Sequence, residues 1–421
     1  MQILLLNQCF YPDVVSTAQH LTDLALGLAE RGHQVTVIAS DRGYDDPEMR
    51  FPRREEWKGI TVIRLTARGL GKGAKWRRAV TFAGFLILCA LRMARLPRFD
   101  LVVALTSPPL ISLLGSLFVR IRGGRFISWV MDLNPDEAVA AGWLKPTSVT
   151  ARILSSLMRY SLRHSNRVIA LDRFMKERIQ RYGVPDERIS VTPPWAHDDS
   201  IAFDEHARCF FRDRHNLRQA FVVMYSGNHS PCHPLDTLLE AALRLGEKRD
   251  IAFCFVGGGS EHTKVKLFAS EHKLDNITTL PYQPLSQLSG SLSAADLHAV
   301  VMGDEFAGIL HPCKVYNILA VGRPFLYIGP PESHINDIVS QSSNGVAYYS
   351  ARHGDVTEVV SHILEAAERK SLNGHGRPGS ANKFAKRNLL PRMIQLLECE
   401  RQSDFQTDGK SEYSKLCRPA H

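Results

Sequence analysis

Residues 1–39 read MQILLLNQCFYPDVVSTAQHLTDLALGLAERGHQVTVIA. The apolar runs at 3–7 and 35–39 each predict a short strand. Between them, residues 16–31 carry apolar side chains three and four positions apart, which predicts an amphipathic helix that ends at Gly32. A strand, a helix and a second strand in this order indicate a βαβ unit, and hence a parallel sheet.

The same alternation runs through most of the chain and is interrupted at Pro193-Pro194. In the first half, further strands are expected at 60–65, 101–105, 126–131, 168–170 and 189–192. In the second half, strands are expected at 221–225, 251–256, 277–280, 297–301 and 325–328. Helices are expected there near 235–245, 261–272, 312–321, 332–340 and 355–369. The pattern predicts an α/β protein with two doubly wound units.

We therefore expect five segments along the chain. They are a first domain at 1–194, a linker at 195–219, a second domain at 220–376, a helix at 377–401 that packs back on the first domain, and a disordered tail at 402–421. Ligands of doubly wound sheets bind beyond the carboxyl ends of the strands. Functional residues are thus expected in the loops that follow strands in both domains.

The cysteines and histidines argue against a disulfide framework and against a metal enzyme. None of the eight cysteines forms a CxxC pair, so free thiols and a reducing, cytoplasmic location are expected. The 17 histidines include no HExxH motif, so we expect no metal, and no other cofactor.

Positive charge is concentrated at 71–99, a stretch without Asp or Glu. The apolar run 79–91 inside it is too short to span a bilayer, and no transmembrane helix is expected. One interpretation is a helix bound peripherally, through 72–98, to the anionic inner face of the plasma membrane. The other is a half-buried helix with a solvated basic rim. No nucleic-acid-binding motif accompanies the charge, so no nucleic acid partner is expected.

Residues 304–330, DEFAGILHPCKVYNILAVGRPFLYIGP, predict an anion site. A helix opening at Pro312 would present free backbone amides and the positive end of its dipole. Lys314 would lie in the first turn, after a loop containing Gly308. This arrangement favours a diphosphate, and the alternative is a surface helix with an incidental lysine.

Two glycine-containing turns follow the first two strands of the second domain. Gly227, Asn228 and His229 end one strand, and 257–259 with Gly258 at its centre end the next. Glycine permits close approach of the backbone to phosphate, and Asn and His side chains can donate to it. The alternative is that both segments are ordinary turns between a strand and a helix.

In order and spacing, these segments resemble the GT-B glycosyltransferases of family 4, and most closely the branch of colanic-acid and O-antigen transferases. The resemblance covers roughly residues 1–400. It rests on GN at 227–228, VGGG at 256–259, HPCKVYNILAVGRP at 311–324, NQCFYPD at 7–13, LAERGHQV at 28–35, TSPPL at 106–110, WVMDLNPD at 129–136 and PWA at 194–196.

The resemblance implies two Rossmann-like domains facing across a cleft, and a retaining transfer from a nucleoside-diphosphate sugar without a metal. The acceptor would be a glycan or a lipid-linked sugar in cell-surface polysaccharide biosynthesis. Ser16 and Thr17 would belong to a first-domain loop that closes over the donor. The donor-binding residues would be Gly227, Asn228, His229, Gly258, Gly308, His311, Lys314 and Asn317.

Two acids are candidate catalytic residues. Asp132 ends an apolar strand and could orient a sugar hydroxyl or cap the following turn. Glu305 could bind donor hydroxyls or be a solvated loop residue. The family's second glutamate is replaced here by Asn317, and its histidine before Asp132 by Met131. These departures keep two alternatives open: a non-catalytic partner that binds a nucleotide sugar, and a GT-B nucleotide-sugar epimerase.

Overall fold

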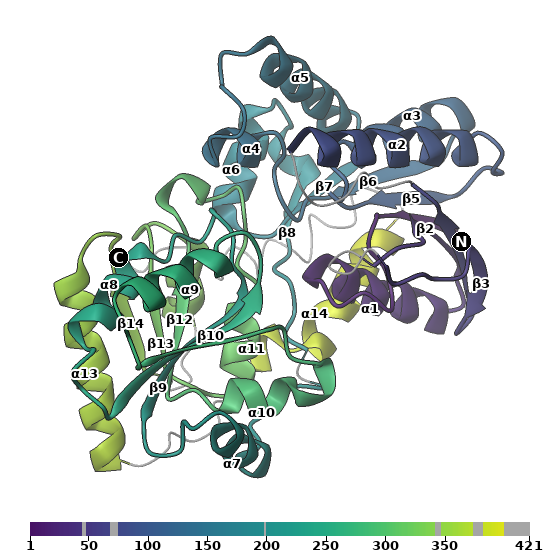
Figure 1. Cartoon of the computed structure of the whole chain (residues 1–421). Coiled ribbons are helices and arrows are strands. Elements are labelled where there is room, and N and C mark those ends of the chain that lie inside the picture. The colour runs from purple at the N-terminus through teal and green to yellow at the C-terminus, as the bar shows by residue number, and fades with distance from the viewer. Residues whose placement is uncertain (44–47, 68–74, 198, 342–346, 374–381, 400–421) are drawn as a thin grey trace.

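The computed structural model describes residues 1–43, 48–67, 75–197, 199–341, 347–373 and 382–399, which form two lobes (Figure 1). The first lobe contains an eight-stranded sheet with the order β3-β4-β2-β1-β5-β6-β7-β8, in which only β3 is antiparallel. Its strands are β1 (Gln2–Leu6), β2 (Gln34–Ser40), β3 (Arg54–Trp57), β4 (Ile60–Leu65), β5 (Leu101–Ala104), β6 (Arg125–Trp129), β7 (Arg167–Ala170) and β8 (Ile189–Val191).

The second lobe contains a six-stranded parallel sheet with the order β11-β10-β9-β12-β13-β14. Its strands are β9 (Phe221–Asn228), β10 (Ile251–Gly258), β11 (Ile277–Leu280), β12 (Leu297–Val301), β13 (Phe325–Ile328) and β14 (Tyr348–Ala351). The strand order reverses between β9 and β12, just as it reverses between β1 and β5 in the first sheet. The prediction of two doubly wound units is confirmed.

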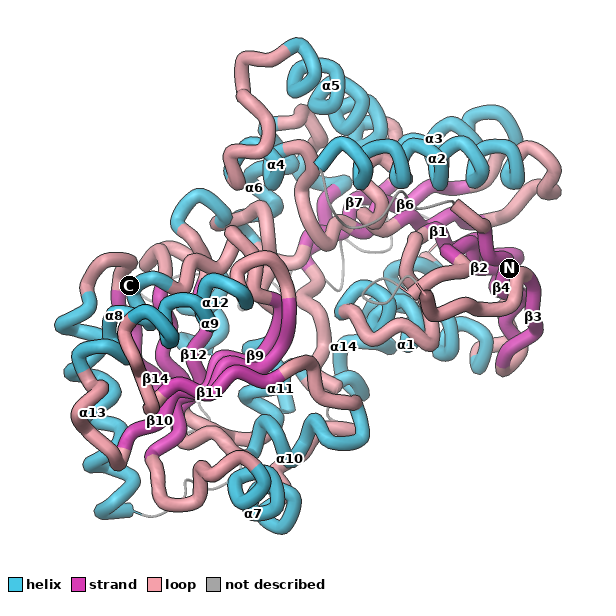
Figure 2. The backbone as a smooth tube through the Cα atoms, in the orientation of Figure 1, coloured by secondary structure: helices cyan, strands magenta, loops and turns pink. Residues whose placement is uncertain are grey.

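Helices cover both faces of the sheets (Figure 2). In the first lobe they are α1 (Ser16–Glu30), α2 (Lys75–Met93), α3 (Ile111–Arg122), α4 (Asp136–Ala140), α5 (Val149–Arg163) and α6 (Arg173–Arg181). Those that follow are α7 (Glu205–Arg214), α8 (Asp236–Arg244), α9 (His262–Glu271), α10 (Leu288–Ser293), α11 (Lys314–Ala320), α12 (His334–Gln341), α13 (Val356–Asn373) and α14 (Lys386–Glu398). Single turns of 3-10 helix occur at η1 (Asp186–Arg188), η2 (Leu285–Gln287), η3 (Asp304–Phe306) and η4 (Asn382–Phe384).

The alternation of side chains along β1 shows why the first sheet is covered on both faces. Ile3 and Leu5 pack into the core that includes α1 and α14, whereas Leu4 and Leu6 pack into the core that includes α2 and α3. A strand that is apolar on both sides must be buried on both sides. The continuous apolar run that predicted this strand is therefore explained by the two layers of helices.

The chain returns to the first lobe at its last described helix. Helix α14 packs against α1, and the Arg31 guanidinium donates to the Glu398 carboxylate at 2.6 Å. The segment predicted to be a linker contains α7. Two α7 arginines, Arg208 and Arg212, pair with the buried Asp296 at the start of β12, and they anchor α7 to the second sheet.

Besides α7, the structure differs from the sequence-based expectation at β3, at β14 and at the start of α11. Strand β3 was not predicted because REEW is polar, and it pairs only along the edge of the sheet beside β4. Strand β14 was also not predicted. Helix α11 begins at Lys314 rather than Pro312, with Cys313 as its N-cap and its thiol donating to the carbonyl oxygen of His311 at 3.2 Å.

The expected tail at 402–421, residues 377–381 of the expected final helix, and Lys72 of the basic stretch lie outside the described residues. Among the described residues, no helix has the length and apolar character needed to cross a bilayer. The seven described cysteines form no disulfide.

Candidate active site

Lys314 begins α11 at the junction of the two lobes. Its ammonium nitrogen is buried, and no described residue hydrogen-bonds or pairs with it. The nitrogen lies 3.7 Å from the centre of the Tyr225 ring, an arrangement that offers a weak cation–π attraction. Burial lowers the pKa of Lys314 from 10.5 to about 7. Because a buried cation without a partner is unfavourable, this position favours an anion beside it.

The turn at Gly227 leaves space next to this ammonium. Gly227 has φ of 140°, and a Cβ at this position would stand 3.1 Å from the Lys314 nitrogen. The neighbouring turn is packed even more closely, because a Cβ on Gly257 would lie 2.0 Å from the Gly227 carbonyl oxygen. Gly258 accepts a hydrogen bond from the His229 amide at 2.8 Å. The two glycine turns therefore form one unit that faces Lys314.

His229 contributes a buried imidazole to the same group. Burial, and then the charge of Lys314, lower the pKa of His229 to about 4. Its Nδ1 lies 3.0 Å from the Gly227 carbonyl, which only an N–H can satisfy, and its Nε2 has no partner among the described residues. A neutral His229 thus presents a lone pair at Nε2. It can donate to a phosphate only when protonated, which a bound anion would favour.

The first lobe supplies Asp132 and Ser16. Burial, and then the neighbouring Glu137 carboxylate, raise the pKa of Asp132 to about 8. Both Asp132 and the Ser16 hydroxyl lie close enough to Cys313 to influence its thiol. No hydrogen bond joins the Asp132 carboxyl to any described residue, so the structure shows no capping of the following turn. Asp132 and Ser16 therefore face the residue that precedes Lys314, and Thr17 follows Ser16 in α1.

Three of the expected donor-binding residues instead contact the first lobe or the chain between the lobes. A Cβ on Gly308 would lie 2.7 Å from the Phe174 backbone of α6. The His311 Nδ1 lies 2.7 Å from the Asp172 carboxylate, and Asn317 accepts a long hydrogen bond of 3.4 Å from the His197 amide. The structure accounts for these residues as contacts between the lobes rather than as part of the group around Lys314.

Glu305 and Asn228 are exposed, Glu305 on η3 and Asn228 at the end of β9. No described residue hydrogen-bonds or pairs with the Glu305 carboxylate. Trp195 of the PWA segment is 1% exposed, and its ring N–H donates to Asp23 at 2.8 Å. Its ring is therefore packed inside the protein.

Sequence reasoning missed several residues that complete the group. Tyr225 lies inside a strand and gave no signal beyond apolarity. Glu137 was not singled out in the sequence, although its charge helps to raise the pKa of Asp132. His262 begins α9, and its ring meets that of His229 at a centroid distance of 4.9 Å. Only the histidine content of the segment 229–262 could have pointed to this cluster.

Comparison with known proteins identifies the class of enzyme. Residues 17–195 match the model of the "Glycosyl transferase 4-like domain". The "Putative colanic acid biosynthesis glycosyl transferase WcaI" of Escherichia coli K12 is 25% identical over 414 residues, 94% of this chain and 99% of WcaI. The "Probable glycosyltransferase WbjE" of Pseudomonas aeruginosa is 26% identical over 302 residues, 72% and 71% of the two chains.

Solved structures show the same fold. The match to WaaG, a glycosyltransferase involved in lipopolysaccharide biosynthesis, has a TM-score of 0.65 at 15% identity and covers 94% of this chain and 99% of WaaG. HepE of Anabaena, solved with UDP and glucose, matches with a TM-score of 0.68 at 16% identity and covers 94% and 99%. This chain is a glycosyltransferase with the GT-B fold, and its residues 17–195 are similar to the family 4-like domain. The resemblance inferred from the sequence is confirmed.

The buried charge of Lys314 predicts that the stability of this glycosyltransferase depends on pH. Between pH 7 and 10.5 the unfolded chain retains a proton that the folded chain has lost, so the stability of the folded state rises with pH across this window. Lys314→Met removes the buried charge. We expect the variant to melt at a higher temperature than the parent at pH 6, and this advantage to shrink by pH 9.

Melting curves at pH 6 and 9 test this expectation. Lys264→Met is the matched control, because the Lys264 ammonium pairs with Asp236 at 2.7 Å on the surface. The same melting difference between Lys314→Met and the parent at both pH values would contradict the buried-charge interpretation.

Proposed function

We propose that this glycosyltransferase moves a sugar, with retention at the anomeric carbon, from a nucleoside-diphosphate sugar to a glycan or lipid-linked acceptor in cell-surface polysaccharide biosynthesis. The observation that carries the proposal is the buried, unpartnered ammonium of Lys314 facing the Gly227 turn. The named roles of WcaI and WaaG and the UDP bound to HepE support the class of substrate.

The chemistry follows from where charge develops. As the bond between the anomeric carbon and the phosphate oxygen breaks, negative charge grows on the leaving diphosphate. A pre-placed cation in a water-poor site stabilises this charge more than it stabilises the bound donor. We propose that the Lys314 ammonium performs this role without a metal. The acceptor hydroxyl forms the new bond on the face of that carbon that the phosphate leaves, so the configuration is retained. We propose that Asp132, in the first lobe, takes the proton of this hydroxyl.

Nucleotide binding is the direct test of the donor site. A ligand that binds only the folded state at 100 times its Kd stabilises it by about 2.7 kcal/mol. We expect UDP, GDP or ADP to raise the melting temperature of the parent, and Lys314→Met to lose most of this shift. Lys264→Met should retain the full shift. An unchanged shift in Lys314→Met would remove Lys314 from the donor site.

Turnover tests the role of Asp132. If the Asp132 carboxylate accepts the proton, the rate should rise with pH through about 8, because the raised pKa keeps this group protonated below that value. Asp132→Asn should retain the nucleotide-dependent melting shift and lower the turnover number about 100-fold or more. Glu137→Gln removes the neighbouring negative charge, so it should lower the pKa of Asp132 and move the rising limb to lower pH.

The pH profile of initial rates with a donor panel measures both effects. Full activity in Asp132→Asn would contradict the role of Asp132 as the proton acceptor. So would a Glu137→Gln variant whose rate rises over the same pH range as that of the parent. A parent that binds nucleotide sugars but turns over none of them would favour the non-catalytic partner instead.

A basic and apolar surface on the first lobe supports a membrane-bound acceptor. Helix α3 lies between α2 and α5, and these three helices contain no Asp or Glu (Figure 1). We call their outer side the α2-α3-α5 face. Its exposed arginines are Arg77, Arg120, Arg122, Arg152, Arg159 and Arg163. Its exposed apolar side chains are Val80, Ile87, Leu88, Leu91, Leu117, Ile121, Val149 and Ile153.

The inner side of α2 packs on the sheet through Phe85, Cys89 and Met93, so this helix is also half-buried. This burial agrees with the interpretation of α2 as a half-buried helix, and membrane binding is a proposal. The outer side adds Ile121 at 79% exposure and Val149 at 70%. We propose that the α2-α3-α5 face holds the enzyme against an anionic membrane, with arginines at the phosphates and apolar side chains at the acyl boundary.

Vesicle co-sedimentation tests this face. We expect binding to vesicles of phosphatidylglycerol and phosphatidylcholine, with little binding to phosphatidylcholine alone and a loss of binding at high salt. The double variant Leu91→Glu with Ile121→Glu should lower the bound fraction at least several-fold. Leu267→Glu is the control, since Leu267 is 56% exposed on α9 of the second lobe. Equal binding by the double variant and the control would contradict the proposal.

A further inference from the structure

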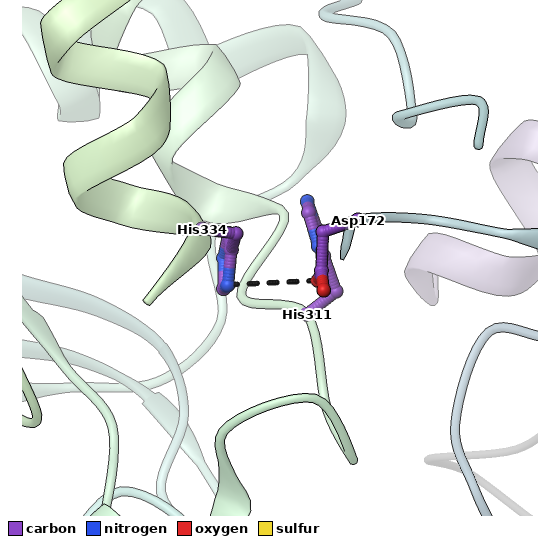
Figure 3. A group of neighbouring side chains, drawn as sticks. All are labelled: Asp172, His311 and His334. Atoms are coloured by element: carbon purple, nitrogen blue, oxygen red, sulfur yellow. Dashed lines mark hydrogen bonds and ion pairs between the residues drawn. The ribbon is translucent and has the colours of Figure 1, made fainter. Parts of the chain in front are cut away.

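Three buried metal-binding side chains meet where the lobes touch, away from the residues assigned to the reaction. Asp172 follows β7 and caps α6 by accepting from the Met175 amide at 2.8 Å. His311 lies in the loop before α11, and His334 begins α12. Figure 3 shows the carboxylate of Asp172 beside the two imidazoles. One lobe therefore supplies an oxygen donor and the other supplies two nitrogen donors.

The three donor atoms are close together and shielded from solvent. Asp172 Oδ2 lies 2.7 Å from His311 Nδ1 and 3.8 Å from His334 Nδ1. One donor atom from each residue falls within 4.8 Å of the others, and the three residues are at most 6% exposed. The two rings stack, with centroids 3.8 Å apart and planes inclined by 23°.

His334 is the member of this cluster that the protein alone does not satisfy. Its Nε2 is buried without a hydrogen-bond partner among the described residues, and its Nδ1 approaches only the Asp172 oxygen, at 3.8 Å. A neutral imidazole carries one N–H donor and one lone pair, and leaving such groups unsatisfied in the interior is unfavourable. Because the 3.8 Å contact is too long for a hydrogen bond, the Nδ1 lone pair of His334 is available to an ion held beside the carboxylate and the second imidazole.

We propose that Asp172, His311 and His334 bind one divalent transition-metal ion of the zinc class, which joins the two lobes. Two imidazole nitrogens and one carboxylate oxygen are donors that zinc and cobalt accept. The site is closed, as structural metal sites are, so the ion stabilises the arrangement of the lobes and takes no part in sugar transfer.

The surroundings fit this donor set. His311 Nε2 lies 2.7 Å from the Tyr316 hydroxyl, so an Nε2–H can donate there and leave the Nδ1 lone pair for the ion. Asp172 keeps its cap on α6 through Oδ1 and offers Oδ2. On binding, the ion takes the place of the proton between Asp172 Oδ2 and His311 Nδ1, and a neutral His311 carries its one proton on Nε2, facing the Tyr316 hydroxyl.

Binding requires small adjustments of side chains. Donor atoms in a tetrahedral zinc site lie about 3.3 Å apart, given zinc–ligand distances of about 2.0–2.1 Å. The 2.7 Å contact to His311 must lengthen and the 3.8 Å contact to His334 must shorten, each by about half an ångström. The lone pairs of stacked rings run side by side, so the His334 ring must turn about its Cβ–Cγ bond to aim at a shared ion. No hydrogen bond to a described residue opposes this turn.

The site would reinforce contacts that already join α6 to the second lobe. The Arg173 guanidinium donates to the Asp337 carboxylate at 2.6 Å, and Arg178 donates to the Ala307 carbonyl at 2.8 Å. The first of these pairs is largely solvent-exposed and contributes little by itself. A buried metal bond between Asp172 and the two histidines would be the strongest link in this contact.

Cobalt absorption tests the proposal on the full chain. Protein freed of metal with a chelator is titrated with Co²⁺, and bound metal is counted by mass spectrometry. We expect one equivalent per chain with the visible absorption bands of tetrahedral cobalt, displacement by Zn²⁺, and a rise in melting temperature with either ion. His334→Ala should lose the bands, and Tyr316→Phe should weaken binding about 10- to 100-fold.

His362→Ala is the matched control, because His362 on α13 lies near Glu358 and Glu365 and could bind cobalt at the surface. It should leave the bands unchanged. Parent protein without a stoichiometric tetrahedral signal at micromolar cobalt would overturn the proposal, and this result does not depend on any variant folding. Bands that persist in His334→Ala but vanish in His362→Ala would assign the metal to the surface instead.

Discussion

The ammonium of Lys314 is buried between two lobes without a counter-charge, and much of the arrangement around it follows from that constraint. Burial can be tolerated because the Tyr225 ring lies against the charge and the glycine at 227 leaves room beside it. The buried charge also affects neighbouring histidines, because it helps to lower the pKa of His229 and His233. A bound diphosphate would favour the charged form of Lys314 and of the two histidines whose pKa values it helps to lower.

The segment that carries Lys314 also holds the lobes together. Some of its residues make contacts between the lobes, and others line the proposed donor site. Gly308 packs on the α6 backbone, His311 contacts Asp172, and Asn317 receives the amide of His197. Lys314 and Cys313 lie between these contacts in sequence, and Cys313 lies close to Asp132 and Ser16. The position of the cation relative to the first lobe is thus set by the residues on either side of it. A change at an interface residue would therefore be expected to alter the donor site without touching the donor.

Most of the fold could be predicted because the strands are continuous apolar runs with polar ends. Residues 60–65, 277–280, 297–301 and 325–328 are strands with the expected bounds. Strand β3 escaped because the sequence REEW at an edge needs no apolar pattern, and α7 escaped because its buried face consists largely of arginines paired with Asp296. In both cases the stabilising partner is distant in sequence, and periodicity reports only on burial of apolar side chains.

The site was predictable to the extent that it is local. Lys314 and the glycine turns follow strands of one sheet, so topology alone placed them together. The grouping of His311 with Gly308 and Asn317 as donor residues came from their nearness in sequence to Lys314, yet neighbours on a loop point in different directions. The Asp172, His311 and His334 cluster shows the limit most clearly, because its members are separated by 139 and 23 positions and come from both lobes. Spacing rules such as HxxxH detect ligands on one helix, whereas these side chains meet only because two sheets bring their carboxyl ends to a common junction.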